Sequence, residues 1–559
     1  MTNFVQVVAV LVGAAVVSFS ARAEACGCFA PPDSATPIVQ AGERILFAVQ
    51  NGKVTAHIQI QYAGDAKDFG WLLPLPSVPV LKVGTDELFT ALLAQTQPTY
   101  VVQNVQGKAC PNAGPSLSLG CASYAPTASV RGIPDEAVPP PTPLVVRSSV
   151  GPYEYAVLKA DSKTDMLKWL SDNRFFIPTG TEDVVGPYIR PGSYFLALKL
   201  KSGASSGDIA PVVLEYASQL PMIPLILTSV AAQPNMGIQV WVVGTGRAIP
   251  RNFHHVVIND AQLEWMNGVS NYAEVVTRAV AEAPDKHAFV TEYAGTSSVM
   301  RDRLAPPGRF GTVEALAAKT SPGAFVEHLK ATSFPSTAGG PLPAPIKSLI
   351  ANAIPDPPAL RQRGVVEDQF YDALDYYLGD FRTQNPDVFV GYQSSFDAPV
   401  LAREIFNTWV ASMRETDALF TTFPKLTRLF TTLSPQDMTA DPVFSFNPSL
   451  PDVALEHTAS LVMNCGTSDL KTEQGLSLPV QGGFPRSTLT RKGPTPFALR
   501  LETLSEEGPP VVVTDNATAI RDVLDPDAAA AMPTEGCAAV DPTSLALVVL
   551  VARLRRRRA

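Results

Sequence analysis

Two apolar runs joined by Asn51-Gly52 place the strongest constraint on how this chain can fold. Residues 43–49 read ERILFAV, and residues 54–62 alternate apolar with polar side chains. Asn-Gly readily adopts the left-handed backbone of a two-residue turn, so this pattern is typical of a β-hairpin. The alternation predicts a half-buried antiparallel strand whose polar face carries His57, and we expect that side chain to face solvent.

Short strand-like and helix-like segments continue along the chain. Strands are expected over 69–75, 153–159, 194–200, 212–216, 224–229 and 238–243. Helices are expected over 86–94, 163–171, 272–282, 313–319, 324–331 and 399–420, the first capped by Thr85. The pattern predicts an α+β protein, with an antiparallel, β-rich, sandwich-like N-terminal region followed by a mainly helical C-terminal region.

Proline-rich stretches mark the expected domain boundaries. Residues 333–358 contain seven prolines and a Gly-Gly pair, which is typical of a linker. The expected divisions are a signal peptide over 1–23, a β-rich head with inserted helices over 24–332, a linker over 333–358, a mainly helical domain over 359–526, a spacer over 527–536 and a sorting tail over 537–559. In the helical domain, a stripe at four-residue spacing is expected to face the core: Leu401, Ile405, Trp409 and Met413.

The N-terminus has the pattern of a secretory signal. Residues 4–19 are almost wholly apolar, and Ala21-Arg22-Ala23 follows them. This small-x-small motif is typical of a signal-peptidase site, so we expect cleavage after Ala23 and export of the mature chain.

The C-terminus has the pattern of a short anchor. Residues 545–552 (LALVVLVA) are apolar but fall well short of the roughly 20 residues of a helical membrane span. An arginine cluster follows, and positive charge of this kind stays on the cytoplasmic side of a membrane. Its members include Arg555, Arg556, Arg557 and Arg558. We expect the tail to hold the protein at a membrane.

Together with Gly536-Cys537, this tail resembles the myxobacterial C-terminal sorting tails, which combine a Cys, a short hydrophobic helix and an Arg cluster. In that family the tail is processed near the Cys and the protein reaches the cell surface. The resemblance implies that Cys537 is a processing or lipid-attachment site.

Composition narrows the classes of partner. Charged residues make up 17% of the 559 residues, below the roughly 25% of an average globular chain, and the 51 prolines exceed the average share. The formal net charge is −9 even with the basic tail included. A body this acidic binds phosphate backbones poorly, so we expect no nucleic-acid partner.

Four of the six cysteines, Cys26, Cys28, Cys110 and Cys121, lie in the first quarter of the mature chain. In an oxidising compartment we expect them to form disulfides, for which three pairings are open. Zinc is the alternative, although Cys26-x-Cys28 lacks the usual ligand spacing. Cys465 is expected to be left over, buried and inert.

Three passages carry a second resemblance: ACGCFAPP at 25–32 leading into GERILFAV at 42–49, FGWLLPLP at 69–76, and residues 271–276 with AFVTEYAG at 288–295. Together they resemble the uncharacterised bacterial family catalogued as domain of unknown function 2330. That family has no established activity, so the resemblance implies no catalytic residue. It supports export and paired cysteines.

Catalytic motifs are weak. Residues 203–207 fit the G-x-S-x-G pattern, but strands are expected on both sides, where a nucleophile elbow needs a strand and then a helix. His254 and His255 are adjacent, so in a strand they face opposite ways, one expected to be buried and the other solvated. A hydrolase would have to use Ser205, one of these histidines and an acid such as Asp208.

Oxygen ligands for calcium are a further possibility at Asp437, Asp441, Asn447 and Asp452, although their spacing is not that of an EF-hand. We expect no cofactor, no metal and no catalytic residue. The leading hypothesis is an exported protein, anchored at the cell envelope or surface, that binds or scaffolds a protein or envelope partner. The alternative is an exported hydrolase whose site is not recognisable from the sequence.

Overall fold

The computed structural model describes residues 28–29, 40–59, 69–108, 144–159, 161–175, 182–201, 209–332, 334, 342–465, 467–481, 488–489 and 494–524. The expected signal peptide, spacer and sorting tail lie outside this set, as do Ala23, Cys537 and the arginines of the tail. Cys26, Cys110, Cys121, Ser205 and Asp208 lie outside it as well. Within the described residues, no helix is long and apolar enough to cross a bilayer.

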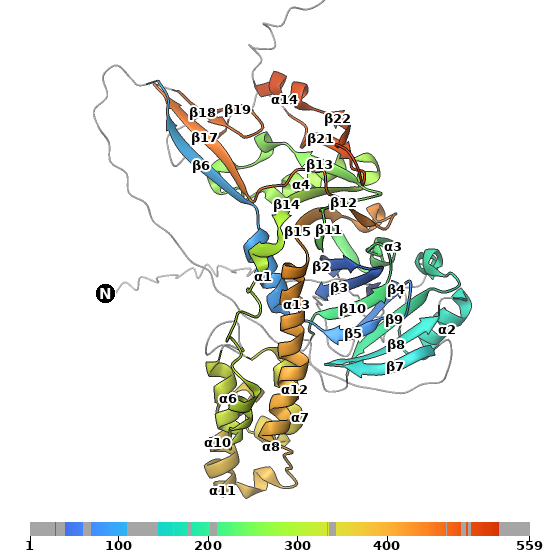
Figure 1. Ribbon diagram of the computed structural model, residues 1–559, viewed down its shortest axis with the longest axis vertical. Coiled ribbons are helices and arrows are strands. Elements are labelled where there is room, and N and C mark those ends of the chain that lie inside the picture. Colours follow the sequence, from blue (N-terminus) through green and yellow to red (C-terminus); the bar gives the residue numbers. More distant parts are fainter. Residues whose placement is uncertain are drawn as a thin grey trace, which may run out of the picture.

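A ten-stranded mixed sheet forms the centre of the molecule (Figure 1). Its strands run in the order β22-β21-β13-β14-β15-β11-β2-β3-β10-β5. In chain order they are β2 (Gln40–Gln50), β3 (Lys53–Gln59), β5 (Val80–Val83), β10 (Val212–Ala217), β11 (Ala232–Gly244), β13 (His254–Ile258), β14 (Ala288–Thr296), β15 (Lys425–Leu433), β21 (Ala498–Thr503) and β22 (Val511–Asp515). The predicted hairpin is confirmed: β2 and β3 pair antiparallel around Asn51 and Gly52, which both have positive φ.

A five-stranded antiparallel sheet covers one face of this central sheet, so the predicted α+β class with a sandwich-like N-terminal region is confirmed. Its order is β1-β4-β9-β8-β7, with β1 (Cys28–Phe29), β4 (Gly70–Leu75), β7 (Leu144–Val150), β8 (Tyr153–Lys159) and β9 (Tyr194–Leu200). Phe47 and Ile58 of the central sheet share one apolar core with Trp71 of β4. Helices α2 (Lys163–Asp172) and α3 (Leu225–Thr228) lie beside the smaller sheet.

One helix packs on the opposite face of the central sheet. Leu46 and Trp241 on that face pack with Leu92 of α1 (Asp86–Thr96), whose predicted cap is confirmed by the Thr85 side chain accepting from the Glu87 N–H. His57 pairs in register with Leu46 and therefore shares this covered face. The expectation of a solvent-facing His57 is wrong: the residue is 4% exposed, because β3 is covered on both faces.

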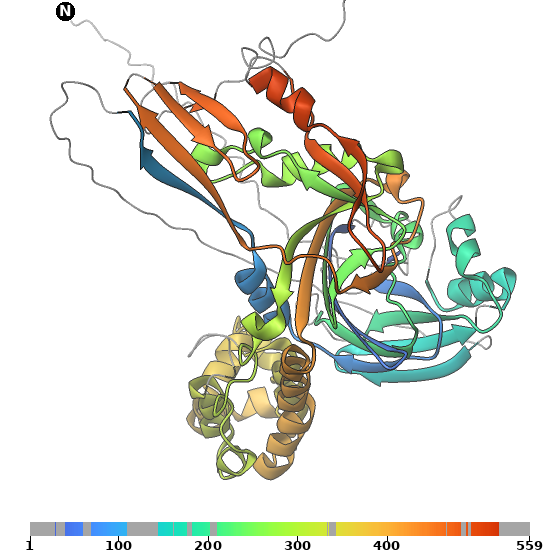
Figure 2. The ribbon, with the colours of Figure 1, turned by 45° about the horizontal axis from the view of Figure 1, so that its top comes forward.

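The other helices of this core form a bundle, which we call the helical layer and which projects from one end of the sheet. It is one excursion between β14 and β15, two neighbouring antiparallel strands (Figures 1 and 2). Its helices are α5 (Val313–Ala317), α6 (Pro322–Ala331), α7 (Ala344–Ala353), α8 (Pro358–Gln362), α9 (Glu367–Asp372), α10 (Leu374–Tyr376), α11 (Arg382–Gln384), α12 (Ala398–Ile405) and α13 (Ala411–Thr422), with a π-helical turn between the last two. The predicted core stripe is confirmed, since Leu401, Ile405, Trp409 and Met413 are all buried.

Two ranges differ from their expected content. The stretch 333–358 contains helix α7, whose Ile346 and Ile350 are buried in the helical core. Pro343 and Pro345 lie at the helix start, where a missing N–H costs nothing, so proline content alone does not mark a linker here. The range 359–526 is helical only to Thr422, after which the chain returns to the sheets through β15 to β22.

A third, five-stranded sheet projects from the body, and we call it the arm (Figures 1 and 2). Its order is β20-β19-β18-β17-β6, with β6 (Thr99–Gln106), β17 (Glu456–Asn464), β18 (Thr467–Lys471), β19 (Ser477–Gln481) and β20 (Thr488–Leu489). The edge strand β6 runs parallel to β17, although the two are far apart in the sequence. The remaining elements are a β12–β16 pair (Arg247–Pro250 and Phe444–Asn447), α4 (Tyr272–Ala281) and α14 (Ala517–Leu524).

Candidate functional site

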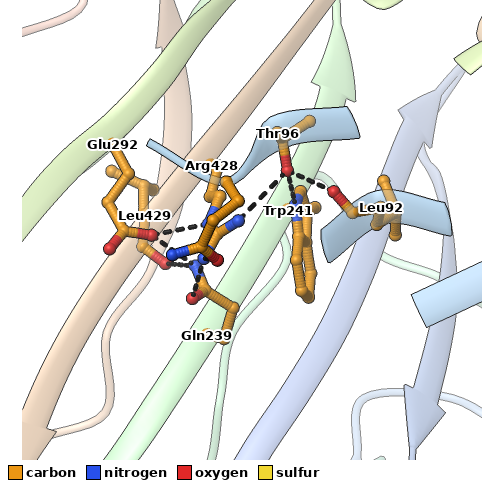
Figure 3. A network of polar contacts seen from close by, with 8 residues as sticks. Leu92, Thr96, Gln239, Trp241, Glu292, Arg428 and Leu429 are labelled. Carbon is orange, nitrogen blue, oxygen red and sulfur yellow. Dashed lines mark hydrogen bonds and ion pairs between the residues drawn. The ribbon is translucent and has the colours of Figure 1, made fainter. Parts of the chain in front are cut away.

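A buried ion pair lies at the middle of the central sheet (Figure 3). Arg428 of β15 donates from Nε to Oε2 of Glu292 of β14 at 2.6 Å, and their side chains are 3% and 2% exposed. The β14–β15 register shifts between Thr291 and Tyr293, so Glu292 occupies an irregularity in the ladder. Such irregularities redirect a side chain, and here the carboxylate meets the guanidinium of the neighbouring strand.

Gln239 of β11 completes this pair (Figure 3). Its Nε2 donates to Glu292 Oε2 at 3.1 Å and to the Leu429 carbonyl at 2.8 Å, while its Oε1 accepts from Arg428 Nη2 at 3.1 Å. Two charges removed from water are tolerated only when their remaining hydrogen-bonding capacity is satisfied. Gln239 contributes both a donor and an acceptor to that requirement.

The same network reaches helix α1 (Figure 3). Thr96 Oγ1 accepts from Trp241 Nε1 at 2.9 Å and from Arg428 Nη1 at 3.4 Å, and it donates to the Leu92 carbonyl at 2.5 Å. Arg428 also donates to Gln97 Oε1 at 3.0 Å and lies over the Trp241 ring, 5.5 Å from its centroid. The C-terminal end of α1, from which β6 departs, is therefore fixed to the sheet.

Two tyrosines extend the buried cluster to the base of the arm. The rings of Tyr272 of α4 and Tyr100 of β6 pack with their centroids 5.8 Å apart, and Tyr272 lies near the charge of Glu292. Burial, with Glu292 adding negative charge, raises the pKa of Tyr272 far above its ordinary value, and burial raises the pKa of Tyr100 as well. Tyr100 also stacks on His457 of β17 at 4.9 Å between ring centroids. Both phenols stay protonated, and the network acts as a positioning device between body and arm.

A second polar cluster surrounds His255. Arginine can only donate, so the Arg247 Nη2 contact at 3.4 Å makes His255 Nε2 the acceptor, and Nδ1 then donates to Glu502 Oε2 at 3.0 Å. Burial lowers the pKa of His255, which favours this neutral form. The expected division of the two histidines holds only for His255, because His254 is half-buried rather than solvated. The hydrolase hypothesis stays untested, since Ser205 and Asp208 lie outside the described residues.

The residues considered as calcium ligands make separate local contacts. Asp437 pairs with Lys286 at 2.9 Å, and Asp452 pairs with Lys425 at 2.5 Å. Asp441 Oδ1 accepts from Tyr188 at 3.0 Å, and Asn447 donates to the Ser505 carbonyl at 2.7 Å. Each side chain serves a different local contact, and no group of three potential metal ligands occurs in the described part of the chain.

A small cavity lies between the central sheet and the five-stranded sheet that contains β4. Its volume is about 20 Å³, and its lining includes Trp71 of β4 and Thr228 of α3. Both residues are buried, and neither Trp71 Nε1 nor Thr228 Oγ1 has a hydrogen-bond partner among the described residues. Since this volume corresponds to about one water molecule, the cavity does not fit a substrate.

Cys465 differs from its expected state. It is disulfide-bonded and exposed, rather than left over and buried. Its backbone N–H donates to the Lys108 carbonyl at 2.9 Å, just beyond the ends of β6 and β17. The pairing of Cys26, Cys28, Cys110 and Cys121 stays a prediction, because only the backbone of Cys28, in β1, is among the described residues.

The arm has one buried face and an open edge. One face is apolar and buried against the body through Ala459, Leu461, Leu470 and Leu478. Strand β6 forms the edge and contains no charged residue, and Val101 and Val105 are exposed on it. An uncharged, exposed edge strand is a template for pairing with another chain.

The arm is joined to the body through the turn between β18 and β19. Gln474 in this turn donates from Nε2 to the Ile258 carbonyl at 2.8 Å and accepts at Oε1 from the Asp260 N–H at 3.1 Å. Burial, together with the nearby charge of Glu473, raises the pKa of Asp260 to about 7. The joint therefore contains a carboxyl group that ionises near neutral pH.

Comparisons with known proteins identify one similarity. The model of a family described as an uncharacterised protein conserved in bacteria, DUF2330, matches residues 20–305, just over half of the chain. No curated protein matches the chain. No solved structure matches it either.

Arg428→Met should lower the free energy of unfolding by about 3 to 5 kcal/mol, because it leaves the Glu292 carboxylate buried without its counter-charge. Arg428→Met combined with Glu292→Met should recover part of that loss. The exposed pair Arg363–Asp387 offers a matched control, and Arg363→Met should cost less than about 1 kcal/mol. Chemical denaturation of the four proteins measures these differences. Equal losses for Arg428→Met and Arg363→Met would contradict the role of the buried pair.

Asp260→Asn should change how stability depends on pH. The folded-state pKa of Asp260 is about 7, above the ordinary value of 3.8, so its contribution is complete below about pH 4 and is lost as the pH rises to about 7. Asparagine does not ionise, so the variant should gain stability relative to the wild type between about pH 4 and pH 8, by up to about 4 kcal/mol. Denaturation midpoints of both proteins, measured across this pH range, test the prediction. A difference that stays constant with pH would refute the shifted carboxyl group.

Cys110 is the partner that we expect for Cys465. It lies two residues beyond Lys108, within about 7 Å of extended chain, whereas Cys121 lies thirteen residues beyond. Peptide mapping without reduction should recover a cross-link between the peptides of Cys110 and Cys465. Cys465→Ala serves as the control and should remove this species. A Cys110–Cys121 cross-link in the wild-type protein would contradict the assignment.

Proposed function

We propose that this chain, which belongs to the DUF2330 family of uncharacterised proteins conserved in bacteria, is an exported binding or scaffolding module anchored at the cell envelope. The observation that carries the proposal is the arm, an exposed sheet with an uncharged edge strand. Residues 1–23 and 537–559 support export and anchoring by their sequence patterns alone. The acidic body makes nucleic acid an unsuitable partner.

The arm is suited to binding because its base is fixed while its outer strands are open. Tyr100, at the start of β6, packs against His457 and edge-on against Trp265, with ring centroids 5.4 Å apart for the second pair. Farther along β6 the side chains of Gln103, Asn104 and Val105 are exposed. A preordered surface loses little conformational entropy when a partner binds.

The disulfide of Cys465 at the outer end of the arm fits an oxidising compartment. A cross-link there holds the strand ends together against fraying. It also supports the view that the arm functions outside the cytoplasm, where such bonds persist. The proposed partner is a protein or another envelope component that meets the arm at this end.

A photo-cross-linking residue introduced at Val105 tests the proposal in cells. We expect a discrete cross-linked product in the envelope fraction. The same residue at Val390, which is 84% exposed in the helical layer, is the matched control and should give no such product. The combined change Val101→Lys and Val105→Lys should abolish binding of the captured partner without loss of folding. Recovery of the protein in the cytosol, or equal capture from both positions, would refute the proposal.

A further inference from the structure

The two edge strands of the central sheet differ in how they are protected from pairing with another chain. At one edge, Lys82 of β5 pairs with Glu215 at 3.0 Å and with Glu415 of α13 at 2.7 Å. Ser412 of α13 donates to the Val83 carbonyl at 3.1 Å, so a helix lies over the end of this strand. Charged side chains and a covering helix are the usual means of preventing an edge strand from pairing with another chain.

Strand β22, at the other edge, differs: its one charged residue, Asp515, stands at the strand end and has no ion-pair partner among the described residues. All five of its residues are exposed, and Val511, Val512 and Val513 have exposed fractions of 63%, 48% and 49%. Its neighbour in the sheet is β21, and no strand lies on its other side among the described residues (Figure 1). Three successive β-branched residues favour extended backbone, which is the conformation that an added strand requires.

Charge around β22 indicates what kind of strand it accepts. The segment from Leu504 to Asn516 contains Glu506, Glu507 and Asp515 but no Lys or Arg. Glu506 lies 3.5 Å from Arg251, whereas Glu507 and Asp515 are exposed and have no ion-pair partner among the described residues. Acidic groups therefore lie at both ends of the strand, and the residues from Val511 to Thr514 between them are uncharged. The one basic neighbour is Arg500 of β21, which lies opposite Asp515.

A second copy of this chain fits the strand poorly. Antiparallel pairing of two β22 strands would place Asp515 of each copy beside the Val511 end of the other. That end follows Glu506 and Glu507, so like charges would meet at both ends of the pair. An extended segment with basic flanks would instead find opposite charge at each end.

We propose that β22 is a strand-addition site for an extended, apolar segment of a partner protein flanked by lysine or arginine. Backbone hydrogen bonds to the open edge supply affinity, and the valines contact alternate side chains of the added strand. Glu507 and Asp515 select basic flanks. This site lies outside the arm, so it is independent of the surface assigned to the proposed function.

Two synthetic peptides test the site on the purified full-length protein. Both have a core of alternating valine and threonine; one has lysines at both ends and the other has glutamates. We expect the lysine peptide to bind at least tenfold more tightly by fluorescence anisotropy. A third peptide, with lysine ends and N-methyl groups along one edge of its backbone, should lose binding. Equal binding of the lysine and glutamate peptides would overturn the charge assignment.

Matched variants locate the binding. Val512→Lys should weaken binding of the lysine peptide at least tenfold. Val390→Lys, an equal change at another exposed valine, should leave that binding unchanged. Glu507→Lys should reduce the preference for lysine ends without altering the strand. Circular dichroism checks that each variant is folded.

Three outcomes would reject the proposal in distinguishable ways. Unchanged binding by Val512→Lys would place the peptide elsewhere. A wild-type dimer in sedimentation that Val512→Lys dissociates would show that a second copy occupies the edge. Loss of peptide binding with Val101→Lys and Val105→Lys, but not with Val512→Lys, would assign the peptide to the arm instead.

Discussion

The buried pair of Arg428 and Glu292 is the interaction on which the arrangement of the molecule depends. Removing one partner of such a pair typically costs about 3 to 5 kcal/mol, so the two strands have one acceptable register. Gln239 links the third strand to the pair, and Thr96 links helix α1 (Figure 3). Because β6 begins just after α1, the same contacts fix the direction in which the arm leaves the body.

This network also explains why the folded unit extends beyond the residues that the family model matches. The matched residues stop at 305, but β15 begins at Lys425 and lies between β14 and β11 in the central sheet. Without β15 the sheet would lose its middle strand, and Glu292 would lose its counter-charge. The arm shows the same dependence, since its first strand precedes residue 110 and its others follow residue 455. The family region and the later segments form one folded unit.

Local features of this fold could be predicted from the sequence, and long-range ones could not. The hairpin at Asn51-Gly52, the Thr85 cap and the stripe containing Trp409 depend on residues within a few positions of one another. The burial of His57 depends on what covers the sheet, and α+β patterning does not specify that. Arg428 and Glu292 are separated by 136 positions, and neither has a local signal that indicates its partner. Seven prolines predicted a linker over 333–358, where tertiary packing instead supports α7.

The placement of the helical layer has a consequence for how this architecture tolerates change. The layer leaves the sheet at Thr296 and returns at Lys425, and these two residues are direct cross-strand partners. Adjacent antiparallel partners lie only about 5 Å apart, which is a gap that a short turn can also close. The chain segment between them can therefore lengthen, shorten or be replaced during evolution while the order of the strands stays the same. In topological terms, the helical layer is an insertion into the connection of a β-hairpin formed by β14 and β15.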